Sequence, residues 1–216
     1  MDGEIRQAKA ADLAAVEGLY DEVIERLEKG ENTTGWFRGW YPTRETALRA
    51  IEAGEMYVMY REGALAGSMV LNSIQPDVYH TLEWNVQAQG EEILLVHTLA
   101  VSPRFRGKGI STALMDFVEK EAALRGCRCI RFDTSARNIP AIRLYERLGY
   151  EFRGTVDLGL TDMPAAGYDE FRCYEKAVKP LESGAAETVS LGTSKAAAPK
   201  KDHPNAASER SWEERV

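Results

Sequence analysis

The segment Arg104 to Ser111, Arg-Phe-Arg-Gly-Lys-Gly-Ile-Ser, combines two glycines with basic side chains. An apolar run over residues 93–101 predicts a buried strand before it, and apolar residues at helical spacing predict a helix from Gly109 to Gly126. The first N–H groups of a helix have no intrahelical acceptors and lie at the positive end of the helix dipole. Because glycine also lets the main chain approach a ligand closely, the junction predicts a diphosphate site.

Residue types at this junction exclude two common phosphate loops. A nucleoside-triphosphate loop has Lys-Ser or Lys-Thr after its last glycine, whereas Gly109 is followed by Ile110. A dinucleotide loop has a third glycine, where Thr112 stands here. The pattern that remains is Arg-x-x-Gly-x-Gly. For this segment alone, a plain strand-to-helix turn with solvated arginines stays open as the alternative.

A second segment with chemical potential runs over residues 138–150, Asn-Ile-Pro-Ala-Ile-Arg-Leu-Tyr-Glu-Arg-Leu-Gly-Tyr, after a predicted strand over 129–133. Asn138 is suited to cap a helix, and Gly149 suits the left-handed residue just past its end. Tyr145 lies on the apolar face of that helix. It is an ordinary core aromatic in one interpretation and a phenol that donates a proton in the other.

Together the two segments resemble the signature blocks of the GCN5-related N-acetyltransferase (GNAT) family, in the same order and at the family's separation. The resemblance covers residues 93–157, and the N-terminal third fits in its order of elements. It implies a single-domain α/β fold with a mixed central β-sheet flanked by helices. In that family the two central parallel strands splay apart and open a slot for acetyl-CoA. The implied reaction is direct transfer of an acetyl group from acetyl-CoA to an amine.

The resemblance also assigns roles to individual residues. Tyr145 occupies the family's general-acid position, from which a phenol can protonate the coenzyme sulfur. Main-chain groups of the predicted strand are implied to face the pantetheine arm and the acetyl carbonyl, the glycine-containing loop is implied to hold the diphosphate, and Asn138 lies on the pantetheine side. The implied coenzyme-binding set is Leu99, Ala100, Val101, Arg104, Phe105, Arg106, Gly107, Lys108, Gly109, Ile110, Ser111 and Asn138.

His97 is the candidate base. It precedes Thr98-Leu99-Ala100-Val101, and arylalkylamine acetyltransferases look similar there, with a histidine in the matching His-x-Leu-Ala-Val pattern. An imidazole can accept a proton from an ammonium group near neutral pH. The alternative is a core histidine whose ring nitrogens satisfy main-chain groups. Glu91 and Glu92 are reserve candidates, of which at most one points into the cleft because neighbours on a strand alternate.

Aromatic residues mark the segments that build the acceptor pocket in this family. Trp36, Trp40 and Tyr41 lie between the first two predicted helices, and Trp84 lies in an insert over residues 75–89. Such rings can form a cage over a cationic or aromatic amine, or they can close the core under a long loop. The insert favours a small-molecule amine as the acceptor. The alternatives are a protein N-terminus or lysine as the acceptor, or a sensor domain that binds acyl-CoA without turnover.

The elements that position these residues follow from local signals. A strand is predicted over residues 4–8, and Asp12 is expected to cap a helix that ends at Gly30. A second helix follows Thr43, with Ala47, Leu48 and Ile51 facing inward. The remaining predicted strands cover residues 56–61, 65–71, 152–158 and 171–178, and the first two of these are joined by a turn at Glu62-Gly63.

Composition sets the broad class. The chain has 216 residues, 44% of them hydrophobic, which suffices for one enzyme domain over residues 1–179. Residues 180–216 are rich in Ala, Ser, Lys, Glu and Pro and are expected to form a disordered tail. The net charge of −7 argues against nucleic-acid and anionic-membrane binding. The three cysteines lack metal-ligand spacing, so no metal is expected. A cytoplasmic location is expected, and the family resemblance is compatible with a homodimer.

Overall fold

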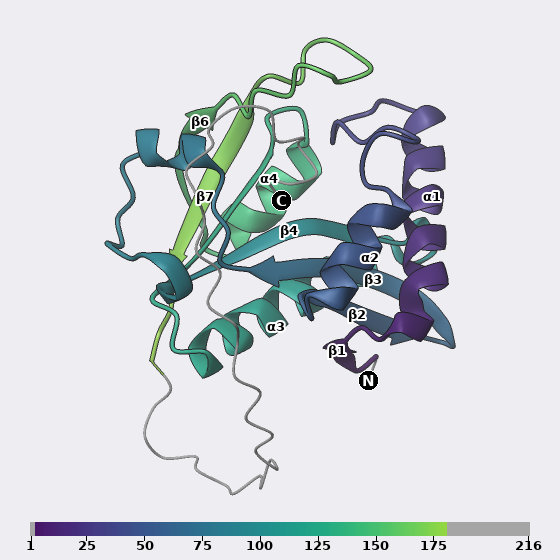
Figure 1. Cartoon of the computed structure of the whole chain (residues 1–216), viewed down its shortest axis with the longest axis horizontal. Helices are drawn as coiled ribbons and strands as arrows, with labels where there is room; N and C mark the ends of the chain where they lie inside the picture. Colours follow the sequence, from purple (N-terminus) through teal and green to yellow (C-terminus); the bar gives the residue numbers. More distant parts are fainter. Residues whose placement is uncertain (1–2, 181–216) are drawn as a thin grey trace, which may run out of the picture.

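A computed structural model describes residues 3–180 as a seven-stranded mixed sheet with helices on both faces (Figure 1). The order of strands across the sheet is β1-β2-β3-β4-β5-β7-β6. All neighbours are antiparallel except β4 and β5, which are parallel. The strands are β1 Ile5–Gln7, β2 Met56–Arg61, β3 Ala64–Asn72, β4 Ile93–Val101, β5 Cys129–Ser135, β6 Glu151–Val156 and β7 Phe171–Ala177. The predicted fold class is confirmed.

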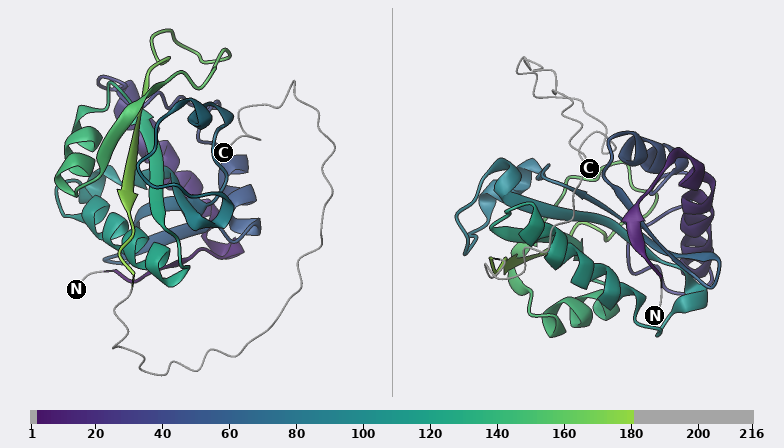
Figure 2. Two further views of the ribbon diagram at one scale, coloured as in Figure 1. Left: turned by 90° about the vertical axis from the view of Figure 1, so that its left-hand side faces the viewer. Right: turned by 90° about the horizontal axis from the view of Figure 1, so that it is seen from below.

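The helices cover the sheet in two pairs (Figure 2). Helices α1 and α2 pack on one face through a cluster that includes Val16 and Ala47. Helices α3 and α4 pack on the other face through a cluster that includes Leu114 and Tyr145. The bounds are α1 Leu13–Glu28, α2 Arg44–Glu52, α3 Ile110–Leu124 and α4 Ile139–Arg147. No helix within residues 3–180 is long and apolar enough to cross a membrane.

The hairpin of β2 and β3 follows the prediction closely. Its two turn residues, Glu62 and Gly63, have φ angles of 52° and 74°. Positive φ at both central residues defines the turn whose twist matches that of two antiparallel strands. The predicted tail over residues 180–216 lies, beyond Pro180, outside the described residues.

Two local predictions on the α1 and α2 face need correction. Asp12 directly precedes α1, yet its side chain caps no helical N–H group. Its carboxylate instead accepts hydrogen bonds from Arg6 at 2.8 and 2.9 Å and from the Tyr60 hydroxyl at 2.8 Å, because a 3-10 turn delivers Asp12 to the sheet. On α2, Ala47 and Ala50 are the buried positions, whereas Leu48, which was expected to face inward, is only partly buried.

The centre of the sheet opens between β4 and β5. These strands pair only from Ile93↔Cys129 to Leu95↔Arg131. Beyond that point β5 stays paired with β7 as far as Ser135↔Phe171, and β4 stays paired with β3 as far as Val101↔Gly67. Each central strand is therefore held by its outer neighbour, and the sheet divides into two wings with a gap between them.

Candidate active site

A β-bulge bends β4 where the gap begins. Ser68 pairs with Ala100 and Val70 pairs with His97, so Thr98 and Leu99 together oppose one residue of β3. Thr98 has a φ of 49°, a strained conformation for a β-branched residue. A hydrogen bond between the Thr98 and Tyr41 hydroxyls holds it. Because a bulge leaves its extra residue out of the ladder, main-chain groups here are free to face the gap.

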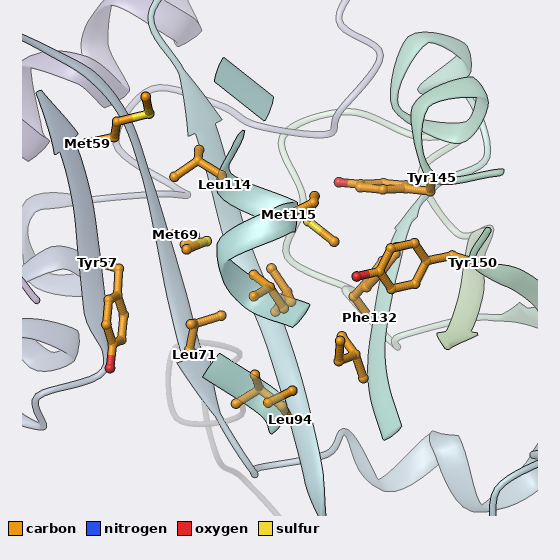
Figure 3. Close-up of a cluster of buried hydrophobic side chains, with 14 of the residues drawn as sticks. Tyr57, Met59, Met69, Leu71, Leu94, Leu114, Met115, Phe132, Tyr145 and Tyr150 are labelled. Atoms are coloured by element: carbon orange, nitrogen blue, oxygen red, sulfur yellow. The ribbon is translucent and has the colours of Figure 1, made fainter. Parts of the chain in front are cut away.

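Tyr145 extends into the interior from α4. Its ring packs against Phe132 of β5, with ring centroids 4.4 Å apart, and its hydroxyl points away from the α4 ribbon (Figure 3). Burial raises the pKa of the phenol, so it keeps its proton at neutral pH. The hydroxyl makes no hydrogen bond with any residue among 3–180, although only 8% of the residue is exposed. A phenol hydroxyl that has no protein partner can form a hydrogen bond with a ligand.

Asp133, on β5, is a candidate site residue that the sequence analysis missed. It lies two positions beyond the last β4–β5 pair, Leu95↔Arg131, and therefore at the mouth of the gap. Its Oδ2 accepts a hydrogen bond of 2.7 Å from the Tyr79 hydroxyl. Desolvation raises the pKa of the carboxyl to about 6. The sequence signal was a single acidic residue next to Phe132 on an otherwise buried strand.

His97 lies on the β4 side of the gap and is 8% exposed. Its Nε2 lies 3.0 Å from Oδ1 of Asn72, and Nδ2 of Asn72 donates to Glu55 at 3.0 Å. Burial lowers the pKa of the imidazole to about 4. The ring is consequently neutral at pH 7 and is bound to a β3 side chain.

The glycine-containing loop presents main-chain groups at the start of α3. Gly107 and Gly109 have φ angles of 75° and 79°, and Gly109 is the residue that precedes the helix. The first turn of α3 carries no acidic side chain to compete with an anion. Phe105 and Ile110 are each 2% exposed and anchor the loop to the core, so those two residues have only main-chain groups to offer a ligand. The exposed members are Arg104, Arg106, Gly107, Lys108 and Gly109.

The rest of the predicted coenzyme set lies on β4 and at the start of α3. Leu99 is part of the bulge, Ala100 and Val101 follow it on β4, and Ser111 lies in the first turn of α3. Asn138 uses its side chain locally, because Oδ1 accepts a hydrogen bond from Ala141 N–H at 3.4 Å and caps α4.

Three of the four predicted pocket residues lie together between α1 and α2. Trp36 packs edge-on against Tyr41, and Trp40 does the same, with ring centroids 6.2 and 6.3 Å apart. The same segment reaches the β6–β7 loop, because Phe37 contacts Tyr168 with centroids 5.5 Å apart. The Tyr168 hydroxyl also donates to the carbonyl oxygen of residue 32 at 2.6 Å. These contacts connect the two wings of the sheet.

Trp84 lies apart from this group. Its ring covers the Arg131 guanidinium at 4.2 Å, and its indole N–H donates to the Tyr79 carbonyl oxygen at 3.0 Å. Arg131 forms a buried ion pair with Glu175 of β7 at 3.0 Å. Glu175 in turn accepts a hydrogen bond from Asn85 N–H at 2.8 Å. Trp84 thus anchors the insert to the sheet and brings Tyr79 to Asp133.

The geometry now defines a class of protein. A parallel strand pair that splays open, a phenol packed on β5 beside the gap, and a helix N-terminus preceded by glycines together suit a ligand with a diphosphate and a long arm. The profile of the Acetyltransferase (GNAT) family matches residues 21–150. The chain belongs to this acetyltransferase family, and acetyl-CoA is its cosubstrate.

Solved structures share the fold. A GNAT-family acetyltransferase from Streptococcus agalactiae is 20% identical, with a TM-score of 0.62, covering 82% of this chain and 96% of that one. A phosphinothricin acetyltransferase from Sinorhizobium meliloti in complex with acetyl-CoA is 22% identical, with a TM-score of 0.60 and coverage of 87% and 98%. The ribosomal-protein-S18-alanine N-acetyltransferase from Escherichia coli is 15% identical, with a TM-score of 0.57 and coverage of 84% and 97%. The fold therefore occurs with small-molecule and with protein acceptors, and does not by itself define the acceptor.

Proposed function

We propose that the chain is an N-acetyltransferase that moves the acetyl group of acetyl-CoA directly to a primary amine of a small molecule. The observation that carries the proposal is the Tyr145 side chain, which is 8% exposed and packs on Phe132 of β5 beside the β4–β5 gap. Its hydroxyl has no hydrogen-bond partner among residues 3–180. An amine acceptor needs such a donor, because the departing thiolate must be protonated.

The residues around the gap fit acetyl-CoA. The N–H groups of the first turn of α3 and the exposed basic side chains of the Arg104–Ser111 loop suit the diphosphate. Main-chain groups at the Thr98–Leu99 bulge suit the acetyl carbonyl, because the bulge leaves them outside the ladder. Acetyl-CoA supplies a thioester that is activated toward an amine nucleophile.

The contacts between the two wings support a small acceptor. Phe37 and the carbonyl of residue 32 contact Tyr168 of the β6–β7 loop, and Arg137, before α4, lies 3.7 Å from Glu31. A peptide needs an extended groove across this end of the sheet, whereas these contacts bridge it. Trp36, Trp40 and Tyr41 pack together in the segment that makes these contacts. Trp84 holds Tyr79 in place by donating a hydrogen bond to its carbonyl oxygen. His97 stays a candidate proton acceptor.

A panel of amines and peptides tests this function through CoA release from acetyl-CoA. We expect turnover of small primary amines in preference to peptides with free N-termini or lysines. Tyr145→Phe keeps the ring packing and removes the proton donor, so we expect kcat to fall roughly 100-fold while acetyl-CoA affinity changes little. Acetyl-CoA binding without turnover of any panel member would favour the sensor alternative, and preferred turnover of peptides would favour a protein acceptor.

A further inference from the structure

The gap contains a carboxylate that the acetyl-transfer assignment leaves unused. Asp133 lies at the mouth of the β4–β5 gap and is partly exposed, whereas its neighbours Arg131 and Phe132 are buried. Its Oδ2 is bound by the Tyr79 hydroxyl at 2.7 Å. The other oxygen, Oδ1, accepts no hydrogen bond from any residue among 3–180. A partly buried carboxylate with a free oxygen is ready to accept a donor from a ligand.

The groups that face Asp133 are neutral at pH 7. Burial and the Asp133 charge raise the pKa of Tyr79, from the insert, and of Cys173, from β7. Burial raises the pKa of Tyr145, from α4, and of Tyr41, from the segment before α2, and Asp133 adds to both shifts. Phenols and a thiol whose pKa values are raised carry no charge, so the negative charge of Asp133 has no counter-ion among them.

The strand geometry directs Asp133 toward the acceptor side. Asp133 pairs with Cys173, whose side chain belongs to the cluster beneath the insert and not to the cluster with α3 and α4. Tyr145 approaches from the opposite face, from α4. The phenol and the carboxylate therefore lie on opposite faces of β5 beside the gap, and burial together with the Asp133 charge raises the pKa of Tyr145.

We propose that Asp133 is a catalytic residue that binds the ammonium group of the acceptor through Oδ1 and accepts a proton from it. The proposal rests on the proposed acetyl-transfer function and specifies its substrate class as primary amines that are protonated at neutral pH. Tyr79 is a positioning residue, since its hydroxyl holds the carboxylate at the mouth of the gap.

Transfer of the acetyl group to an ammonium group removes two protons from the nitrogen. Asp133 takes one proton from the ammonium group, and the neutral nitrogen forms a bond to the thioester carbonyl carbon as the carbon–sulfur bond breaks. The nitrogen loses a second proton during the transfer. One proton ends on the coenzyme sulfur by way of Tyr145, and the other leaves Asp133 for solvent. The products are the acetamide, the free thiol of coenzyme A and one proton.

His97, on the other side of the gap, is the competing base. Its Nε2 is bound to Asn72, and burial lowers its pKa to about 4. The pKa of Asp133 is about 6, closer to neutral pH. General-base catalysis is most effective when the pKa of the base lies near the working pH. Asp133 also carries the negative charge that attracts an ammonium group, which a neutral imidazole lacks.

The test compares two nucleophiles of the same size. 2-Phenylethylamine is protonated at pH 7, whereas O-benzylhydroxylamine, with oxygen in place of the methylene next to nitrogen, is neutral. We expect Asp133→Asn to lower kcat/KM at pH 7 at least ~100-fold for the amine and no more than about 3-fold for the aminooxy compound. Asp116→Asn, the same change on the exposed face of α3, is the control and should leave both values unchanged.

Acetyl-CoA titration calorimetry separates failure of this assignment from failure of the function. A wild-type chain that does not bind acetyl-CoA overturns the proposed function itself. A wild-type chain that binds acetyl-CoA and acetylates neither probe nor any amine of the panel overturns both the proposed function and the role of Asp133. A wild-type chain that acetylates only the aminooxy compound overturns the role of Asp133 alone. Equal losses on both probes in Asp133→Asn, or no loss on either, also overturn that role.

Tyr79→Phe provides a second variant in case Asp133→Asn does not fold. The Tyr79 hydroxyl stabilises the carboxylate and lowers its pKa, so its removal should raise the pKa of Asp133. We expect the acidic limb of kcat/KM for 2-phenylethylamine, near pH 6 in the wild type, to move to higher pH. An unmoved limb in a folded Tyr79→Phe variant contradicts the proposal.

Discussion

At the scale of single residues, the raised pKa of Asp133 makes the stability of the fold depend on pH. That pKa is about 6 in the fold, against 3.8 for an unperturbed aspartate. Between those two values the unfolded chain binds fewer protons than the native chain, so stability falls as pH rises from about 4 to about 6 and stays lower above pH 6. Below the unfolded pKa both states are protonated, and the contribution vanishes.

Asp133→Asn should therefore stabilise the protein at neutral pH. The amide is uncharged, so the variant avoids the cost of the desolvated carboxylate, which we put at about 1–3 kcal/mol for this partly exposed group. Urea unfolding at pH 7.5 should show that gain, and unfolding at pH 4 should show little difference between variant and wild type. A gain of the same size at both pH values would mean that packing, and not the charge, is responsible.

At the scale of elements, the loop before α3 joins two requirements at one residue. Gly109 must adopt a φ of 79°, and it must leave the first N–H groups of α3 open to an anion. Asparagine tolerates the left-handed conformation better than most side chains, and aspartate has the same shape with a negative charge. Comparing Gly109→Asn with Gly109→Asp therefore separates the effect of backbone strain from the effect of the added charge.

Gly109→Asp should accordingly weaken acetyl-CoA binding far more than Gly109→Asn. The added carboxylate occupies the positive end of the helix dipole and repels the diphosphate, so we expect its dissociation constant to exceed that of the Asn variant by roughly 10-fold or more. Calorimetric titration with acetyl-CoA at low ionic strength measures both. Equal affinities in the two variants would place the diphosphate elsewhere.

At the scale of the whole molecule, the fold has two wings whose strands pair with each other at three positions between β4 and β5 within residues 3–180. The contact of Phe37 with Tyr168 joins the wings at the periphery, whereas the ion pair of Arg131 with Glu175 lies within one wing, between β5 and β7. All of these strands and helices lie within residues 3–180, and the strand that comes last in the chain, β7, ends at Ala177.

A chain that ends at Pro180 should therefore behave like the full chain. The segment beyond it has few apolar residues with which to offset the entropy of ordering, so we expect the melting temperature to shift by no more than about 2 °C and acetyl-CoA affinity to stay unchanged. Thermal melts and calorimetry of the two chains check this. A large loss of stability would show that residues after 180 pack on the domain.

The sequence alone predicted the helices and strands of the fold, because their signals are local. The turn at Glu62-Gly63, the start of α3 after Gly109, and the cap at Asn138 depend on neighbours a few residues away. Two blocks in the right order then indicated the family, which the family profile confirmed. The roles of Tyr145 and of the loop stay predictions.

Only the tertiary structure showed which side chains surround Asp133 beside the gap. Tyr79 meets Asp133 across 54 positions of sequence, and no local pattern records such a contact. The sequence likewise predicted Asp12 as a helix cap, whereas in the fold its carboxylate accepts hydrogen bonds from Arg6 of β1 and Tyr60 of β2. Aspartate can accept hydrogen bonds from several kinds of donor. Which donor it meets depends on the group that the fold brings within hydrogen-bond distance, and so on the arrangement of the strands.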